Sequence, residues 1–128
     1  FAAASLDDRL KAIAPSAPFL CDYPDYFVLA GWPGDPIEAA AKEAGMSEEE
    51  MFKVLSYFDI KNLTDRIQCP VLMAIGLQDT VCPPHTNFAG YNHITSEKSW
   101  ICYPEAGHNV WQQEEWPVAK QKFFENFH

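Results

Sequence analysis

The sequence predicts an α/β fold in which short buried strands alternate with helices. Residues 69–76, CPVLMAIG, form a continuous apolar run of strand length, as is typical of a parallel strand buried on both faces. Residues 98–104, KSWICYP, are expected to form the next strand. Helical patterns precede, separate and follow the two runs, and this alternation indicates a doubly wound parallel sheet with helices on its faces.

The amino-terminal part begins in a helix and continues into an expected strand. Residues 2–6 predict the end of a helix, and the polar residues 7–9 form a turn after it. Residues 10–20, LKAIAPSAPFL, are expected to form a short apolar strand that stops at prolines. Proline and glycine interrupt residues 21–36, which excludes one long helix there.

Further helices are expected along the rest of the chain. A short helix at residues 37–45 ends at a glycine, and the next begins at Ser47, which forms a capping box with Glu50. A helix at residues 85–94 is entered through a proline. The final helix covers residues 114–128, with acidic residues at its start and lysines further on, as the helix dipole favours.

The length and composition indicate one acidic domain, residues 1–128, and the order of the expected elements indicates a helical insertion at about residues 22–58. The net charge of −9 argues against nucleic acid and anionic membrane surfaces as partners, because binding them draws on an excess of Lys and Arg. No apolar run approaches the ~20 residues that span a bilayer. The four cysteines show no C-x-x-C spacing, so buried free thiols are expected rather than a disulfide framework.

The first residues, FAAASLDDRL, resemble the second half of a helix. They include no capping residue, no initiator Met and no signal-peptide pattern. We therefore expect the chain to be the C-terminal part of a longer protein. The cellular location would be decided by the segment before Phe1, and the sequence leaves it open.

Two loops that follow the expected strands carry residues suited to catalysis. Asp79 follows the first apolar run, and His108 follows the second, 29 residues later. In a right-handed β-α-β unit the carboxyl ends of the strands lie at one edge of the sheet, so we expect the two side chains to meet. A carboxylate can orient an imidazole that deprotonates a serine, and the order Asp then His is that of the α/β-hydrolases.

The nucleophile of such a triad is missing from the sequence, which contains no G-x-S-x-G elbow. Ser47, in GMSEE, comes nearest, but it lies at an expected helix start. If the opening helix is the one that follows a nucleophile elbow, the serine precedes Phe1. The chain alone is then expected to be inactive, because nothing in it forms the acyl intermediate.

A long stretch of the chain resembles one known esterase family. Residues 57–94, from YFDIKNLTDRI to FAGYNHI, and YPEAGH at residues 103–108 resemble the acetyl xylan esterase / cephalosporin C deacetylase family, carbohydrate esterase family seven. The shared features are Tyr-Phe-Asp, Asn-x-x-x-Arg-Ile, the Cys-Pro-Pro after the acid and a Tyr-Asn before the next strand. PSAPFLCD at residues 15–22 is also similar, whereas residues 25–51 depart from the family pattern.

This resemblance implies the C-terminal part of an α/β-hydrolase fold and removal of acetyl groups through an acetyl-serine intermediate. The implied substrates are acetylated xylo-oligosaccharides, small sugars or cephalosporin C, and no metal or other cofactor is implied. By motif matching, Asp79 is the orienting acid and His108 the general base. The expected partner is a small acetylated carbohydrate, and the full-length enzyme is expected to be a homo-oligomer.

Alternative interpretations stay open for individual residues. Asp79 could be a turn residue and His108 an exposed loop residue. A zinc site of Cys82, His85 and His93 can be drawn, although its spacing fits no structural zinc pattern. Cys82 is interpreted as a packing residue rather than a nucleophile. Pocket wall and core are both open for the aromatic residues Tyr23, Tyr26, Phe27, Trp32, Trp111 and Trp116.

Two other functions are compatible with the same sequence. One is a non-catalytic α/β module that binds a partner or a glycan. The other is an α/β-hydrolase that acts on a different substrate, such as a peptide or a lactone. The distance between Asp79 and His108 separates the first of these from an esterase.

Overall fold

The computed structural model describes residues 1–127, and its centre is a sheet of two parallel strands, β1 (Val71–Gly76) and β2 (Lys98–Tyr103). The register pairs the first residues of the two strands with each other, and likewise the last, so both strands end at the same edge. Every residue of β1 is buried. The two expected strands and their parallel arrangement are confirmed, as is the α/β class.

The strand expected at residues 10–20 is not continuous. Only two isolated parallel bridges join this segment to β1. The amides of Ile13 and Ala17 donate to carbonyl groups in and just before β1, at 3.0 and 3.1 Å. Midway between these donors stands Pro15, which has no N–H, and the ladder is interrupted there. The prediction of a regular strand is therefore wrong, although the segment lies along the edge of β1 where a third strand would lie.

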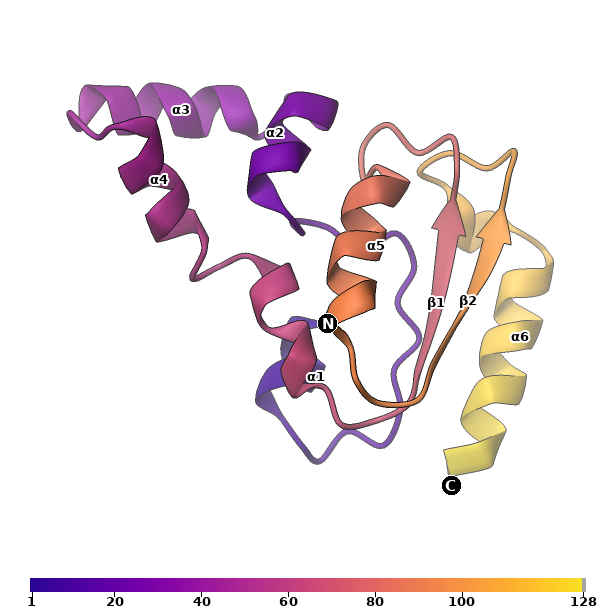
Figure 1. The fold of residues 1–128 in the computed structure, drawn as a ribbon. Coiled ribbons are helices and arrows are strands. Elements are labelled where there is room, and N and C mark those ends of the chain that lie inside the picture. Colours follow the sequence, from indigo (N-terminus) through magenta and orange to yellow (C-terminus); the bar gives the residue numbers. More distant parts are fainter. Residues whose placement is uncertain (128) are drawn as a thin grey trace.

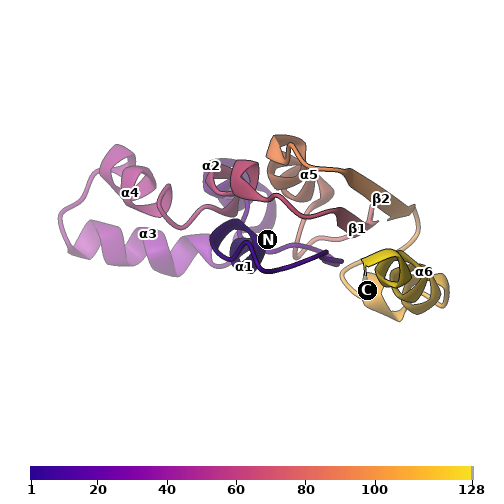
Figure 2. The same ribbon diagram turned by 90° about the horizontal axis from the view of Figure 1, so that it is seen from below.

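Helices cover both faces of the sheet: α5 (Pro84–His93) lies on one face and α6 (Glu115–Phe124) on the other (Figures 1 and 2). The short α1 (Ala2–Leu6) contributes Ala4 to the core on the α5 face. Side chains of β1 alternate between two cores, as the two-residue period of a strand requires. Val71, Met73 and Ile75 pack on the α5 face, and Leu72 and Ala74 pack on the α6 face.

A helical segment stands away from the sheet (Figure 1). It contains α2 (Tyr23–Ala30), α3 (Gly34–Glu43) and α4 (Glu48–Leu55), all within the range expected for an insertion. Its own small core is formed by Tyr23, Tyr26, Phe27 and Met51. The segment therefore holds together by its own apolar contacts.

The boundaries of the helices differ from the sequence prediction in places. The capping box is confirmed, because the Ser47 side chain accepts from the Glu50 amide while the Glu50 side chain accepts from the Ser47 amide. In contrast, α3 starts earlier than expected, at Gly34. The final helix ends at Phe124 and continues as a 3-10 turn, whereas the last residue of the predicted helix, His128, lies outside the described residues.

Short 3-10 helices complete the chain between and after the main elements: η1 (Ile60–Asn62), η2 (Thr64–Arg66), η3 (Val110–Gln112) and η4 (Glu125–Phe127). All four cysteines are free thiols, as expected; Cys21, Cys69 and Cys82 are buried and Cys102 is partly exposed. Within residues 1–127, no helix has both the length and the apolar character needed to cross a membrane.

Candidate active site

Two loops meet at the edge of the sheet where both strands end (Figure 1). The loop after β1 carries Asp79, and the loop after β2 carries His108. Main-chain hydrogen bonds join the loops, since the Leu77 amide donates to the Tyr103 carbonyl (3.2 Å) and the Gln78 amide donates to the Ala106 carbonyl (2.9 Å). The parallel register places the loops side by side, and these bonds hold them together.

The Asp79 carboxylate is buried, with 4% of the residue exposed. Its Oδ1 atom accepts hydrogen bonds from the amides of Val81 and Cys82, both at 2.8 Å. Its Oδ2 atom lies 3.0 Å from Nδ1 of His108. Both oxygens therefore have partners, and the carboxylate is fixed in the orientation that meets the imidazole. The structure brings together the two residues that the sequence singled out.

The His108 ring bridges the buried carboxylate and an open surface, because 40% of its side chain is exposed. A carboxylate on Nδ1 holds the neutral ring in the tautomer with its lone pair on Nε2, and it stabilises the imidazolium after proton uptake. The ring also packs edge-on against Trp111, with centroids 5.1 Å apart. This geometry suits a residue that accepts and returns a proton through Nε2.

A cavity of about 340 Å³ lies beside His108, and its wall is mainly aromatic and aliphatic. Phe19 and Trp32 stack with centroids 5.9 Å apart and planes inclined by 18°. Both of these rings line the cavity, as does Trp111. In size and lining the cavity resembles small-molecule sites in general, which combine apolar walls with a few polar groups.

For the six aromatic residues that could form either a pocket wall or the core, the structure distinguishes the two roles. Trp32 and Trp111 line the cavity. The other four, Tyr23, Tyr26, Phe27 and Trp116, are buried in the cores. Trp32 lies just after α2, so the helical segment contributes to the wall of the cavity.

Cys82 lies close to Asp79, yet its chemistry is that of a packing residue. Only 1% of it is exposed. Burial, together with the negative charge of Asp79, raises the pKa of the Cys82 thiol to about 12. At neutral pH the thiolate that a nucleophile requires is therefore essentially absent.

The zinc ligands considered from the sequence do not form a cluster, since Cys82, His85 and His93 do not gather their ligand atoms within residues 1–127. Two other groups do: Asp79 with Cys82 and His108, and Asp22 with Asp25 and His85. In the first, the thiol is protonated and both carboxylate oxygens have partners.

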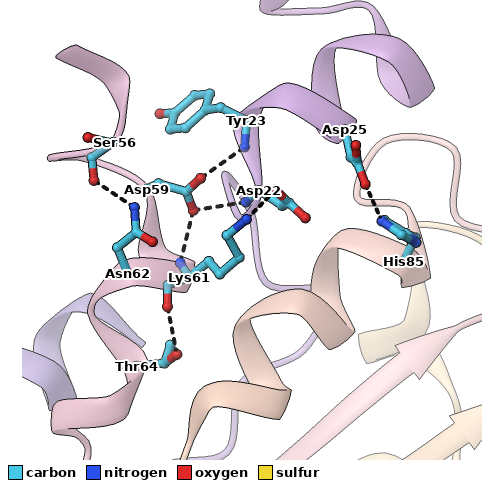
Figure 3. Close-up of polar contacts among 9 residues, drawn as sticks. All are labelled: Asp22, Tyr23, Asp25, Ser56, Asp59, Lys61, Asn62, Thr64 and His85. Atoms are coloured by element: carbon cyan, nitrogen blue, oxygen red, sulfur yellow. Dashed lines mark hydrogen bonds and ion pairs between the residues drawn. The ribbon is translucent and has the colours of Figure 1, made fainter. Parts of the chain in front are cut away.

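In the second group, each side chain already has a polar partner (Figure 3). Asp22 forms an ion pair with Lys61 (2.5 Å), and Asp25 contacts His85 (2.6 Å). The Lys61 ammonium supplies the positive charge that a metal ion would bring to Asp22. The exposed Asp25–His85 contact links α2 to the start of α5.

Two buried residues near the site make contacts that were not predicted from the sequence. Tyr26 of α2 donates its hydroxyl to the carbonyl of Val81 in the Asp79 loop, at 2.5 Å. Asp59 accepts from the amides of Asp22, Tyr23 and Lys61, and so holds the start of α2 (Figure 3). Asp59 belongs to the Tyr-Phe-Asp motif, so the motif itself was the available signal. Tyr26 was considered only as a pocket-wall or core residue, and nothing in the sequence indicated the contact of its hydroxyl.

Comparison with known proteins places this arrangement in a family. The family model "Acetyl xylan esterase (AXE1)" matches residues 1–126. The chain belongs to the acetyl xylan esterase family. The resemblance read from residues 57–94 and 103–108 is therefore confirmed.

Individual members of the acetyl xylan esterase family agree with this assignment. Acetyl esterase Axe7A of Xylanibacter ruminicola is 32% identical over 103 residues, which is 79% of this chain and 22% of Axe7A. Acetyl Xylan Esterase 1 from Thermoanaerobacterium sp. JW/SL YS485 superimposes with a TM-score of 0.84 at 36% identity, over 99% of this chain and 41% of that protein. The acetyl xylan esterase from Paenibacillus sp. R4 gives a TM-score of 0.87 at 37% identity, with the same two coverages of 99% and 41%.

These matches also define the fold. The chain corresponds to a C-terminal part of an α/β-hydrolase, in which the parallel strands and flanking helices are those of the acetyl xylan esterases. It spans 22% of the length of Axe7A and 41% of the length of each solved esterase. None of its 128 residues forms a G-x-S-x-G elbow, so the described site contains the Asp79 carboxylate and the His108 imidazole but no serine elbow.

Proposed function

We propose that this chain supplies the acid and the base of a serine esterase that removes acetyl groups from acetylated carbohydrates. Asp79 is the orienting acid and His108 is the general base. The serine lies in a preceding amino-terminal part, and the two parts together are called the completed esterase below. The observation that carries the proposal is the buried Asp79 carboxylate, fixed 3.0 Å from Nδ1 of a half-exposed His108 beside an aromatic-lined cavity.

The proposed reaction proceeds in two acyl transfers. In the first, His108 takes the serine proton at Nε2 while the serine oxygen attacks the acetyl carbonyl. Collapse of the tetrahedral intermediate breaks the ester bond, and His108 returns the proton to the departing sugar hydroxyl. In the second, water attacks the acetyl-serine, His108 again takes and returns a proton, and acetate leaves with the serine restored. Asp79 stays ionised and stabilises the imidazolium in both steps.

The proposed substrates are acetylated xylo-oligosaccharides and related small sugar acetates. Family membership supports the acetyl ester, and the aromatic walls formed by Phe19, Trp32 and Trp111 support a ring-shaped leaving group. Cephalosporin C, which also carries an acetyl ester on a ring system, is a further proposed substrate. No cofactor enters the proposed reaction.

The completed esterase is also proposed to be a homo-oligomer. Large apolar side chains of the helical segment and the turn after it are exposed, among them Val28, Tyr57 and Phe58. Exposed apolar patches on soluble proteins mark interaction surfaces. Light scattering on the completed esterase checks this: a mass near that of one subunit would contradict it.

The catalytic proposal is tested by hydrolysis of p-nitrophenyl acetate. The completed esterase should be active, His108→Ala should lower kcat by about 10⁶-fold, and Asp79→Asn should lower it by about 10⁴-fold, as expected for removal of a triad base and a triad acid. The 128-residue chain alone should show no serine-dependent turnover. Full activity of His108→Ala would contradict the proposal, and glycan binding without hydrolysis would favour a binding module instead.

A further inference from the structure

Tyr26 connects the helical segment to the loop that carries the proposed acid. Its side chain is fully buried, at 0% exposure, and comes from the first turn of α2. Its hydroxyl donates to the carbonyl of Val81 at 2.5 Å, across 55 positions in the sequence. The contact therefore depends on how the fold places α2 beside the loop after β1 and not on local chain geometry.

The carbonyl that Tyr26 contacts belongs to the peptide unit that also contacts Asp79. The Val81 carbonyl and the Cys82 N–H are parts of one planar peptide group. Tyr26 donates to its oxygen (2.5 Å), and its N–H donates to Oδ1 of Asp79 (2.8 Å). Because the group is rigid, fixing the oxygen also fixes the direction of the N–H. A donor on the carbonyl additionally polarises the amide and strengthens its own donation.

A continuous series of hydrogen bonds therefore runs from α2 to the imidazole. It passes from the Tyr26 hydroxyl through the peptide group to Oδ1 of Asp79, and from Oδ2 of the same carboxylate to Nδ1 of His108 at 3.0 Å. The Tyr26 ring is itself held, since it packs edge-on against Phe19 with centroids 5.7 Å apart. Both ends of the series are anchored by tertiary packing.

We propose that Tyr26 is a positioning residue for the Asp79–His108 pair, acting through the Val81–Cys82 peptide group. The proposal rests on the catalytic roles given above. It implies that the helical segment helps to orient the Asp79 carboxylate. Burial and the charges of its neighbours raise the pKa of the Tyr26 hydroxyl to about 12, which keeps it a donor over the working pH range.

The test compares Tyr26→Phe with Tyr23→Phe. The first variant removes one oxygen and keeps the buried ring. Tyr23 is a matched control because it lies in the same helix and is also buried, and its hydroxyl makes no hydrogen bond to the described residues. Thermal unfolding of both variants records any general loss of stability.

The first readout is the proton NMR signal of His108 Nδ1–H, measured in this chain without any substrate. Tyr26→Phe should shift that signal and shorten its lifetime against exchange with water, because the Asp79 carboxylate is less firmly oriented. Tyr23→Phe should leave the signal unchanged. An unchanged signal in Tyr26→Phe would overturn the proposal.

The second readout is kcat/KM of the completed esterase on p-nitrophenyl acetate. Tyr26→Phe should lower it by about tenfold, through kcat rather than KM, as small misplacements of catalytic groups do. Loss of activity equal to that of Tyr23→Phe would overturn the positioning role. Complete inactivity of the unaltered completed esterase would instead refute the proposed function, while the NMR result would still decide the role of Tyr26.

A third measurement covers the case in which Tyr26→Phe does not fold. In the unaltered chain, the Tyr26 hydroxyl proton should be protected from exchange and should show a nuclear Overhauser effect to protons of the Val81–Cys82 segment. A freely exchanging hydroxyl without that effect would overturn the proposal.

Discussion

Gly76 lies directly against the main chain of Ala106, so that a Cβ atom at Gly76 would stand 2.5 Å from the Ala106 carbonyl oxygen. The Gly107 carbonyl oxygen lies at the same distance from that position. Gly76 is the last residue of β1, and the carbonyl groups that crowd it belong to the loop that carries His108. Because both groups are backbone, neither can move aside as a flexible side chain can. The absence of a side chain at Gly76 is what lets the two site loops approach each other.

Gly76→Ala should therefore both destabilise the chain and separate Asp79 from His108. We expect a loss of about 2 kcal/mol in the free energy of unfolding, as for other overpacked sites. Gly107→Ala is the matched control, because a Cβ atom there would meet its nearest neighbour, the Gln78 carbonyl oxygen, at 3.6 Å, an ordinary contact. Urea unfolding measures the stability, and the His108 Nδ1–H signal reports the pair. Equal behaviour of the two variants would contradict the steric argument.

Asp59→Ala should destabilise the chain through the start of α2. Three main-chain amides, those of Asp22, Tyr23 and Lys61, donate to this buried carboxylate at 2.8 to 2.9 Å. Removing the carboxylate leaves these donors without their acceptor, and we expect this to lower the free energy of unfolding by about 3 kcal/mol. Asp65→Ala is the control, because Asp65 is exposed and should change the stability by less than about 0.5 kcal/mol. Urea unfolding of both variants provides the comparison.

The sequence predicted correctly those parts of the fold that depend on residues close together in the chain. The apolar run of β1, the capping box at Ser47 and the proline entry to α5 each require only neighbouring residues. The segment at residues 10–20 shows the limit of such patterns. It has the composition of a strand and lies beside one, but the missing N–H of Pro15 interrupts the ladder.

In the candidate site, too, some contacts could be predicted from the sequence and others could not. Asp79 and His108 were predicted to meet because each follows a strand and parallel strands end at one edge. The contact of the Tyr26 hydroxyl with the Val81 carbonyl joins residues 55 positions apart, and no sequence period relates them. Asp59 was partly predictable. The Tyr-Phe-Asp motif pointed to the residue, but only the structure shows that its carboxylate accepts hydrogen bonds from main-chain amides of two separate segments.

Stability should fall as the pH rises above about 9. Burial raises the pKa of the thiols of Cys21 and Cys82 from 9.0 to about 12. Between these values the unfolded chain releases thiol protons that the folded chain retains, so ionisation favours the unfolded state. Each thiol should lower the free energy of unfolding by up to about 1.4 kcal/mol per pH unit in that window, and by nothing well below pH 9.

Cys82→Ala isolates this effect, because it removes one of the two thiols whose pKa is raised to about 12. The variant starts from a lower stability owing to the cavity it creates, but its stability should decline less steeply with pH than that of the unaltered chain. Chemical unfolding at several pH values from 7 to 11 measures both slopes. Parallel curves for the two proteins would show that the Cys82 thiol ionises equally in the folded and unfolded states.

Trp32→Ala should weaken the binding of sugar acetates and spare the chemical step. Trp32 is 64% exposed, it stacks on Phe19, and it lines the cavity beside His108. The C–H face of a sugar ring is apolar and is stabilised by contact with an aromatic face, so loss of the indole should cost about 1 kcal/mol of binding. That corresponds to a KM about fivefold higher for acetylated xylobiose with the completed esterase.

The choice of substrate makes this experiment specific. Ethyl acetate contains the same acetyl ester but no ring to stack, so its kcat/KM should be unchanged in Trp32→Ala. Trp32→Phe keeps an aromatic face and should recover most of the affinity for acetylated xylobiose. Because Trp32 is mostly exposed, neither substitution should lower the thermal unfolding temperature by more than a few degrees. Equal losses on both substrates would show that Trp32 supports the fold of the site rather than the recognition of the sugar.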